Sequence, residues 1–340
     1  MEGDSGFIEL TITGLAGQRL ALTASPSDSV GSVRRQVLEV WTLPPRSDMA
    51  LLSAGQLLDD ETLLASLGTP DLQCVRFRQK SRIEILGAGL ETDRYNSYNT
   101  GVAAPDGRIY FAPCSSNHVL VVDTAASAVT TLRCPDLEAD IHFKYMDAGV
   151  LAPNGKIYWA PCCADCVLVV DTMASTVTTI GPEFVGEDKY MTPGFLAPDG
   201  KIYFAPFGVN KVLVVDTVAS DVDTIGPDLP GDDGYDVAGV LVPGGKIVWP
   251  PNSGSTRVLV VDTTASTVTM LGPDVPYEDA YMVPGAVALD GKVYFPPGDA
   301  GRVLVVDTVA STVAALGPEL PGEGKYLAPG VPGPDGKIYF

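Results

Sequence analysis

Five tyrosines recur along the chain at a nearly constant spacing, and acidic residues gather just before them. The tyrosines are Tyr145, Tyr190, Tyr235, Tyr281 and Tyr326. The acids that we select beside them as candidate binding residues are Glu187, Asp188, Asp232, Asp233, Glu278 and Asp279. Tyrosine rings combined with carboxylates can hold the cationic head of Lys or Arg. These residues therefore predict a surface that binds a basic protein or peptide, and the alternative is repeat packing beside a solvated acidic rim.

Two sets of residues raise the question of a metal. Calcium prefers oxygen ligands, but no acidic loop has the Asp-x-Asp-x-Asp-Gly spacing of a dedicated site. The Cys-Cys-Ala-Asp-Cys cluster at 162–166 lacks the second Cys-x-x-Cys pair of a zinc site, and later copies of this loop place Phe207, Asn252 and Gly298 at the corresponding point. We therefore expect free loop thiols and no cofactor. Calcium is kept as an alternative ligand of the acidic loops.

The elements that position these residues come from a repeat. The string Val-Leu-Val-Val-Asp, always followed by Thr, occurs at 119–123, 167–171, 212–216, 258–262 and 303–307, with steps of 48, 45, 46 and 45 residues. In the most regular copy we expect strands at 194–197, 201–205, 211–216 and 222–225, because apolar runs there are separated by Pro-Asp-Gly and other turn residues. Four short strands in such a period predict one β-propeller blade.

The phrases Pro-Asp-Gly-Lys-Ile-Tyr, Lys-Val-Leu-Val-Val-Asp-Thr and Thr-Val-Thr-Thr-Ile resemble the YVTN-type propeller repeat. Complete copies begin near Gly101, Gly149, Gly194, Gly239 and Gly285, and a sixth begins at Gly330 and stops at Phe340. We expect an all-β propeller over residues 83–340 with about six blades, the last one incomplete. Residues 83–86 align with the outer strands of other copies and are expected to complete the ring, because closure removes exposed strand edges.

Evidence for catalysis is weak in this sequence. His118 and His142 occupy different positions of their repeats, without a serine nucleophile motif or a Gly-rich phosphate loop beside them. Positions expected to face the propeller channel repeat nearly unchanged, whereas catalysis needs unlike groups at defined places. We expect no enzymatic activity. The alternative is a metal-dependent hydrolase or lyase similar to propeller lactonases, with the N-terminal region in a regulatory role.

Residues 7–79 share nothing with the repeat. Alternating strands are expected at 7–13 and 19–24, a helix with Val30, Val33, Val37, Leu38 and Trp41 at helical spacing, and further strands at 49–53 and 72–77. The order of these elements resembles ubiquitin, as do Pro44-Pro45, the string at 51–57 (Leu-Leu-Ser-Ala-Gly-Gln-Leu) and the string at 59–63 (Asp-Asp-Glu-Thr-Leu). The resemblance implies a β-grasp domain over residues 1–80.

The ubiquitin resemblance also implies a binding patch. Leu15, Leu52 and Val75 fall where ubiquitin displays the apolar patch that its receptors bind. In place of the conjugation tail, however, the chain reads Arg76-Phe77-Arg78-Gln79-Lys80 and continues, and no lysine precedes Lys80. The resemblance therefore implies a built-in module that docks onto ubiquitin-receptor domains. A β-grasp domain that acts only as a spacer is the alternative.

Composition limits the partners. The chain has 42 acidic and 22 basic residues, a net charge of −20, which argues against nucleic acid and anionic membrane surfaces because both attract Lys and Arg. No signal peptide or membrane span is apparent, and the six cysteines follow no disulfide pattern. We expect an intracellular protein, cytoplasmic or nuclear. The resulting hypothesis is an adaptor whose N-terminal domain engages a receptor while the acidic propeller face holds a basic client.

Overall fold

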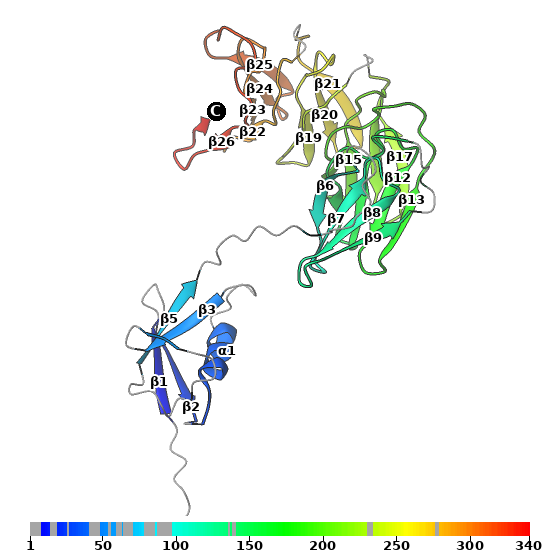
Figure 1. Cartoon of the computed structure of the whole chain (residues 1–340). Helices are drawn as coiled ribbons and strands as arrows, with labels where there is room; N and C mark the ends of the chain where they lie inside the picture. Colours follow the sequence, from blue (N-terminus) through cyan, green and yellow to red (C-terminus); the bar gives the residue numbers. More distant parts are fainter. Residues whose placement is uncertain are drawn as a thin grey trace, which may run out of the picture. The chain divides into compact units, whose positions relative to one another are not determined.

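The computed structural model divides the chain into two units, 1–85 and 86–340. It describes residues 8–13, 19–25, 27–40, 48–53, 56–58, 63, 71–77, 86, 97–134, 137, 141–229, 234–275 and 279–340. Figure 1 labels the helix and most of the strands of the two units. In this described part, no helix combines the length and the apolarity needed to cross a membrane.

The first unit contains a mixed sheet and one helix. Its elements are β1 (Ile8–Thr13), β2 (Arg19–Ala24), α1 (Val30–Val40), β3 (Asp48–Ser53), β4 (Gln56–Leu57) and β5 (Asp71–Phe77). The strand order is β2-β1-β5-β3-β4, with β1 and β5 parallel and the other pairs antiparallel. Each expected strand begins and ends within one residue of its observed limits. The two-residue strand β4 was not expected, because so short a pairing leaves no alternating pattern.

Helix α1 forms because apolar residues and a capping residue agree. Ser29 precedes the helix, and its hydroxyl accepts a hydrogen bond from the Ser32 backbone N–H at 3.3 Å, as an N-cap does. Val30, Val33 and Val37 follow at helical spacing and are buried against strand residues such as Leu10 and Leu51. The apolar stripe of the helix therefore closes one face of the sheet.

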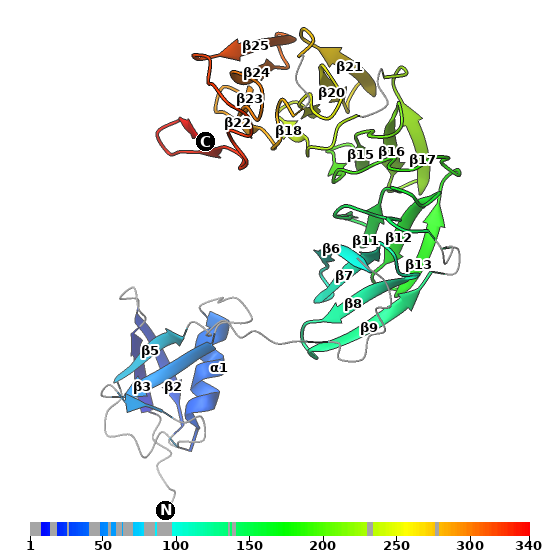
Figure 2. The ribbon, with the colours of Figure 1, turned by 45° about the horizontal axis from the view of Figure 1, so that its top comes forward.

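The second unit is a series of β-propeller blades, which confirms this part of the predicted fold. Five antiparallel sheets of four strands each follow one another, and within every sheet the strands are neighbours in chain order (Figure 2). The strands are β6 (Tyr98–Ala103), β7 (Arg108–Pro113), β8 (His118–Asp123), β9 (Ala128–Arg133); β10 (Val150–Leu151), β11 (Lys156–Trp159), β12 (Val167–Asp171), β13 (Thr176–Ile180); β14 (Phe195–Leu196), β15 (Lys201–Phe204), β16 (Val212–Asp216), β17 (Asp221–Ile225); β18 (Val240–Val242), β19 (Lys246–Trp249), β20 (Val258–Asp262), β21 (Thr267–Leu271); and β22 (Ala286–Val287), β23 (Val293–Phe295), β24 (Val303–Asp307), β25 (Thr312–Leu316).

The third strands of the three middle blades, β12, β16 and β20, are buried on both faces because a neighbouring sheet covers each face. In β8 and β24, buried residues alternate with half-buried ones. In β16, Val212, Leu213, Val214 and Val215 are all buried. The aspartate that ends the strand then starts a turn: Asp216 Oδ1 accepts hydrogen bonds from the N–H groups of Val218 at 3.0 Å and Ala219 at 2.8 Å. The same pair of bonds recurs in the other four blades. Local side-chain bonds of this kind make the turn identical in each copy.

The sixth sheet is a hairpin in the described part of the chain. It contains β26 (Val331–Pro332) and β27 (Ile338–Tyr339), and β26 lies beside β22 of the preceding blade. An incomplete last blade was expected. The strand expected at 83–86 lies outside the described residues except for Leu86, which belongs to no strand.

Candidate functional site

The loops between blades and the loops between the second and third strands form one layer. The interblade loop that ends at Tyr145 gives the clearest case. Backbone N–H groups of Cys162 and Ala164 donate to the Lys144 carbonyl at 2.9 and 3.3 Å, and Cys163 N–H donates to the Phe143 carbonyl at 3.0 Å. Equivalent bonds from Gly298, Ala300 and Asp299 recur three blades later. The two kinds of loop therefore lie on the same side of the blades.

The repeated tyrosines are structural residues of this layer. Tyr145, Tyr190, Tyr235 and Tyr281 are between 0 and 3% exposed. Their hydroxyls donate to the carbonyls of Cys166, Lys211, Arg257 and Arg302 at 3.0, 3.3, 2.9 and 3.1 Å. Burial raises the pKa of Tyr145, Tyr190 and Tyr235. This corrects the expectation of tyrosines that present their rings to a partner, because rings and hydroxyls are already used inside the protein.

Tyr326, the fifth tyrosine, is half-buried and lies edge to face with Phe340, with ring centroids 6.2 Å apart. Among the acids of the same loops, Glu187, Asp188 and Asp279 are exposed. The other predicted acids, Asp232, Asp233 and Glu278, lie outside the described residues. Because four of the five tyrosines are buried, the exposed carboxylates would attract a basic partner mainly through charge and not through cation–π contact.

Two buried lysines in these loops were not anticipated. Lys144 and Lys189 are fully buried, and their Nζ atoms donate to the carbonyls of Ile141 and Gly186 at 2.5 Å. Burial lowers the pKa of the Lys189 amine, although the nearby thiols and carboxylates act in the opposite direction. The sequence does contain a pattern that points to these lysines, because lysine directly precedes the repeated tyrosine at 144, 189 and 325.

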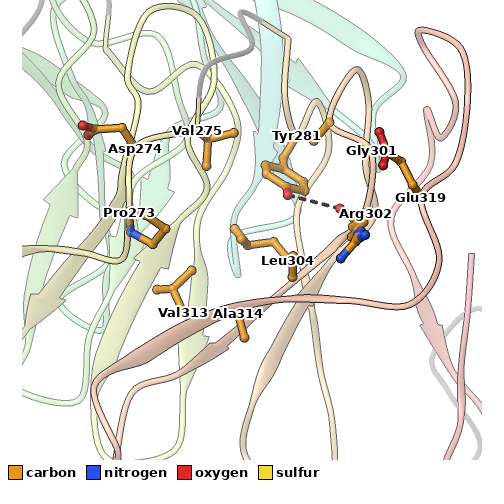
Figure 3. A pocket seen from close by; sticks show the side chains of 12 residues that line it. Pro273, Asp274, Val275, Tyr281, Gly301, Arg302, Leu304, Val313, Ala314 and Glu319 are labelled. Carbon is orange, nitrogen blue, oxygen red and sulfur yellow. Dashed lines mark hydrogen bonds between the residues drawn. The ribbon is translucent and has the colours of Figure 1, made fainter.

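An apolar groove lies at the junction of the β18–β21 and β22–β25 blades (Figure 3). Its volume is about 320 Å³, at the lower end of the range for ligand sites. Its apolar lining, here called the floor, includes Leu304, Val313 and Val275, and the Tyr281 ring lies between Val275 and Arg302 in Figure 3. Asp274 and Glu319 stand on opposite sides of the lining residues in Figure 3, with Arg302 on the same side as Glu319.

The same groove occurs at the junction of the first two blades, with other side chains. This second groove has a volume of about 240 Å³. It is lined by Leu137, Ile141, Lys144, Tyr145, Ala164, Asp165, Cys166, Thr179 and Glu183. In the repeat, Tyr145, Cys166 and Thr179 correspond to Tyr281, Arg302 and Ala315. The same set of repeat positions therefore lines a polar groove in one junction and an apolar groove in the other.

Two cysteines of the loop at 162–166 lie close to an aspartate of the next interblade loop. Cys162 and Cys163 lie on the loop between β11 and β12, and Asp188 lies on the loop between β13 and β14. Their ligand atoms lie within 4.8 Å of one another. Burial and the neighbouring Cys163 and Asp188 raise the pKa of the Cys162 thiol. Sequence spacing missed this group because the acid is 25 residues away from the second cysteine.

Among the described residues, the two histidines form no catalytic triad. His142 Nδ1 lies 3.1 Å from the Ser115 hydroxyl. Within the described residues, neither His142 nor His118 is bonded to a carboxylate that would orient it as a general base. In the part of the chain that the structure describes, the contact between His142 and Ser115 therefore lacks the carboxylate that would complete a triad.

The predicted patch of the first unit is only partly described. Leu15 lies outside the described residues. Leu52 is paired with Gln73, and Val75 with Ala50, one position from the pair of Leu51 with Cys74. Leu51 is buried in the core, so Leu52 and Val75 occupy strand positions of the opposite parity. The side chains of Leu52 and Val75 are outside what the structure describes.

Neither a family model nor a curated protein matches the chain. Among solved structures, a streptogramin B lyase has a TM-score of 0.48 and 13% identity, covering 98% of this chain and 90% of that chain. Virginiamycin B lyase from Staphylococcus aureus has a TM-score of 0.47 and 12% identity, covering 66% and 70%. Ubiquitin from Caldiarchaeum subterraneum has a TM-score of 0.20 and 27% identity, covering 22% and 100%. The activities in these names belong to those proteins.

Proposed function

We propose that the chain is a non-catalytic adaptor in which the propeller blades hold a basic peptide segment of a client protein. The apolar groove between the β18–β21 and β22–β25 blades carries this proposal. An apolar side chain of the peptide occupies the floor at Leu304 and Val313, while its Lys or Arg residues approach Asp274 and Glu319. Clefts that combine an apolar floor with few polar groups are the usual form of binding sites.

The charge of the chain favours a basic occupant over an acidic one. The net charge is −20, and Asp274, Asp279 and Glu319 near the groove are all exposed. Such a field raises the association rate of a cationic segment and disfavours anionic ones. A peptide that lacks either the apolar side chain or the positive charges would use only half of the groove.

We assign the first unit to the ubiquitin-like class. The support is its strand order, β2-β1-β5-β3-β4, with a central parallel pair and one helix between β2 and β3. Together with the ubiquitin-like strings at 51–57 and 59–63, this favours a module that docks onto ubiquitin-receptor domains through Leu15, Leu52 and Val75. The two modules in one chain then raise the effective concentration of the client beside the receptor.

The side chains give less support to a lyase or hydrolase function. The repeated tyrosine hydroxyls donate to backbone carbonyls, and so they are engaged before any substrate arrives. Within the described residues, His142 contacts Ser115 but no carboxylate. Catalysis by a propeller requires unlike, precisely oriented groups, and this arrangement favours binding.

The client half of the proposal is tested by peptide binding to the full chain. Fluorescence anisotropy with labelled peptides should detect binding of basic peptides that contain Leu or Phe, but not of their acidic counterparts. Ala315→Arg should weaken this binding by about tenfold, because it places bulk and positive charge in the groove. Ala310→Arg is the matched control, since Ala310 is exposed in the turn of the same blade. Equal loss in both variants, or no binding by the parent, rejects the groove as the site.

The receptor half is tested separately, so that one half can fail alone. The full chain is measured against a panel of ubiquitin-receptor domains by titration calorimetry. Leu52→Ala should abolish binding, whereas Arg35→Ala, an exposed change on α1, should leave it intact. Binding that survives Leu52→Ala would place the contact elsewhere on the first unit, and absence of binding to every domain would reduce that unit to a spacer.

A further inference from the structure

Three side chains from two loops converge at the junction of the β10–β13 and β14–β17 blades. Cys162 Sγ and Cys163 Sγ are 4.0 Å apart. Both thiols point at the same carboxylate oxygen, Asp188 Oδ1, at 3.5 and 3.9 Å. The cluster therefore offers two sulfur atoms and one oxygen around a single point.

These distances match one face of a zinc tetrahedron. With Zn–S near 2.3 Å and Zn–O near 2.0 Å, tetrahedral coordination requires about 3.8 Å between sulfurs and about 3.5 Å between sulfur and oxygen. The observed separations of 4.0, 3.5 and 3.9 Å differ from these values by a few tenths of an ångström. A metal could be accepted here with only small side-chain rotations.

The backbone on both sides of the cluster is held by hydrogen bonds. Lys189 N–H donates to the Cys162 carbonyl at 3.1 Å, which ties the interblade loop directly to the cysteine loop. Gly208 N–H donates to the Asp188 carbonyl at 2.8 Å. Asp188 itself has a φ of 49°, a left-handed conformation that the loop imposes on a non-glycine residue. The ligand atoms are thus preorganised, which reduces the ordering cost of binding a metal.

The cluster is also specific to this junction. Phe207, Asn252 and Gly298 replace Cys162 in the following three blades. Phe143, which has a φ of 54°, replaces Asp188 in the preceding interblade loop. Repeat packing therefore does not require these side chains, because the same backbone forms without them.

Charge and solvent access fit a bound dication. Two thiolates and one carboxylate would bring three negative charges to a divalent ion, and the buried Lys189 amine interacts electrostatically with all three groups. Cys162 is buried, Cys163 is half-buried and Asp188 is exposed, so the fourth side of the tetrahedron faces solvent. Sites with three protein ligands commonly hold water at that position.

We propose that Cys162, Cys163 and Asp188 form a Zn²⁺ site that joins two neighbouring propeller blades, with a fourth position open to water or to a partner's side chain. Thiolates select zinc over the hard cations, while the carboxylate completes a mixed donor set. The two thiol protons leave to solvent as the two Zn–S bonds form.

The test uses the chelator-treated full chain, kept reduced with a phosphine. Zn²⁺ is titrated in competition with a chromophoric chelator, and we expect binding of a single ion per chain. Cys163→Ser and Asp188→Asn should each weaken binding by at least about tenfold, since even second-shell changes cost 10–100-fold. Both residues are accessible, and Asn tolerates the left-handed conformation of Asp188, so these variants should fold. Cys162→Ser, at a buried position, is the stricter variant.

Cys166→Ser is the matched control. Cys166 lies in the same loop, but its sulfur is 3.7 Å from the Pro182 carbonyl oxygen and is not part of the three-residue group. This variant should bind Zn²⁺ like the parent. Substitution with Co²⁺ adds a second readout, because the thiolate charge-transfer band should weaken in Cys163→Ser and persist in Asp188→Asn.

Three outcomes of the Zn²⁺ titrations would overturn the site. The first is a parent chain that removes no Zn²⁺ from the competing chelator. The second is undiminished binding by the Cys162→Ser/Cys163→Ser double variant, and the third is a Cys166→Ser variant that loses binding as Cys163→Ser does. Ca²⁺ or Mg²⁺ displacing Zn²⁺ at equal concentration would likewise contradict a thiolate site.

Discussion

The junction of the first two blades and the junction of the β18–β21 and β22–β25 blades share one backbone and differ in chemistry. In both junctions, three backbone N–H groups of the loop between the second and third strands donate to two carbonyls of the interblade loop. A buried tyrosine hydroxyl donates to the carbonyl of the residue before the third strand. The first groove is lined by Asp165, Cys166 and Thr179, and the second by Gly301, Arg302 and Ala315. The comparison teaches that the repeat supplies a scaffold and leaves the groove side chains unconstrained.

The largest expected effect tests whether the shared scaffold is equally strong in both junctions. Tyr145→Ala and Tyr281→Ala should each lower the free energy of unfolding by about 3–5 kcal/mol, because each removes a fully buried aromatic ring. Chemical denaturation followed by circular dichroism measures the loss. Tyr326→Ala, at a half-buried position, is the control and should cost much less. A difference of several kcal/mol between the first two variants would show that the junctions are not equivalent.

The next largest effect is a dependence of stability on pH that we expect from the first junction and not from the second. Asp147 in the first junction stands where the buried Val283 stands in the second. Burial raises the pKa of Asp147 to about 6, against about 3.9 in an unfolded chain. Because the folded state holds the proton more tightly, ionisation opposes folding, and the penalty develops between those two pKa values as pH rises. Asp147→Asn should therefore stabilise the protein by about 2 kcal/mol at pH 7 and not at pH 3.

Stability against pH, measured by denaturant titration, gives that comparison. Asp307→Asn is the control with opposite sign. The Ala310 N–H, and then the Val309 N–H, lower the pKa of Asp307, so its contribution is present above the unfolded pKa and lost as pH falls. A stabilisation by Asp147→Asn that is the same at both pH values would rule out ionisation as its cause.

A smaller effect concerns the charge of the two grooves. Arg302 is exposed at the apolar groove, where the first junction has Cys166. Arg302→Gln should tighten binding of a basic peptide by about 2–5-fold, because it removes a like charge worth about 0.5–1 kcal/mol. Stopped-flow measurements should find the gain mainly in the association rate and smaller at high salt. Weaker binding instead would mean that the guanidinium contacts the peptide directly.

The smallest effect lies in the turns of the two blades that follow these junctions. Ser175 and Ser311 have φ values of 53°, a conformation that glycine adopts without strain. Ser175→Gly and Ser311→Gly should each stabilise the protein by about 0.5 kcal/mol, measured as a rise in the denaturation midpoint. Destabilisation in only one of them would show that its hydroxyl has a role particular to that blade.

Much of the fold follows from local pattern. The runs of Val and Leu before each repeated Asp predict the third strand of every blade, since an apolar run bounded by turn residues suits a strand buried on both faces. The tyrosines illustrate the limit of such reasoning. Their regular spacing is compatible with a ligand rim or with packing, and only their burial and hydroxyl bonds, such as that from Tyr281 to the Arg302 carbonyl, decide for packing.

What the sequence alone determined is the architecture: a period of 45 to 48 residues, four strands to a copy, and turns whose bonds join residues two or three positions apart. Those interactions are local, so the order of residues in the sequence is enough to predict them. The tertiary structure decided which side chains meet. Asp188 reaches Cys162 and Cys163 across 25 or 26 positions of the chain because a whole strand pair, β12 and β13, returns the backbone to the same end of the blade. Contacts that depend on such a return leave no local pattern in the sequence.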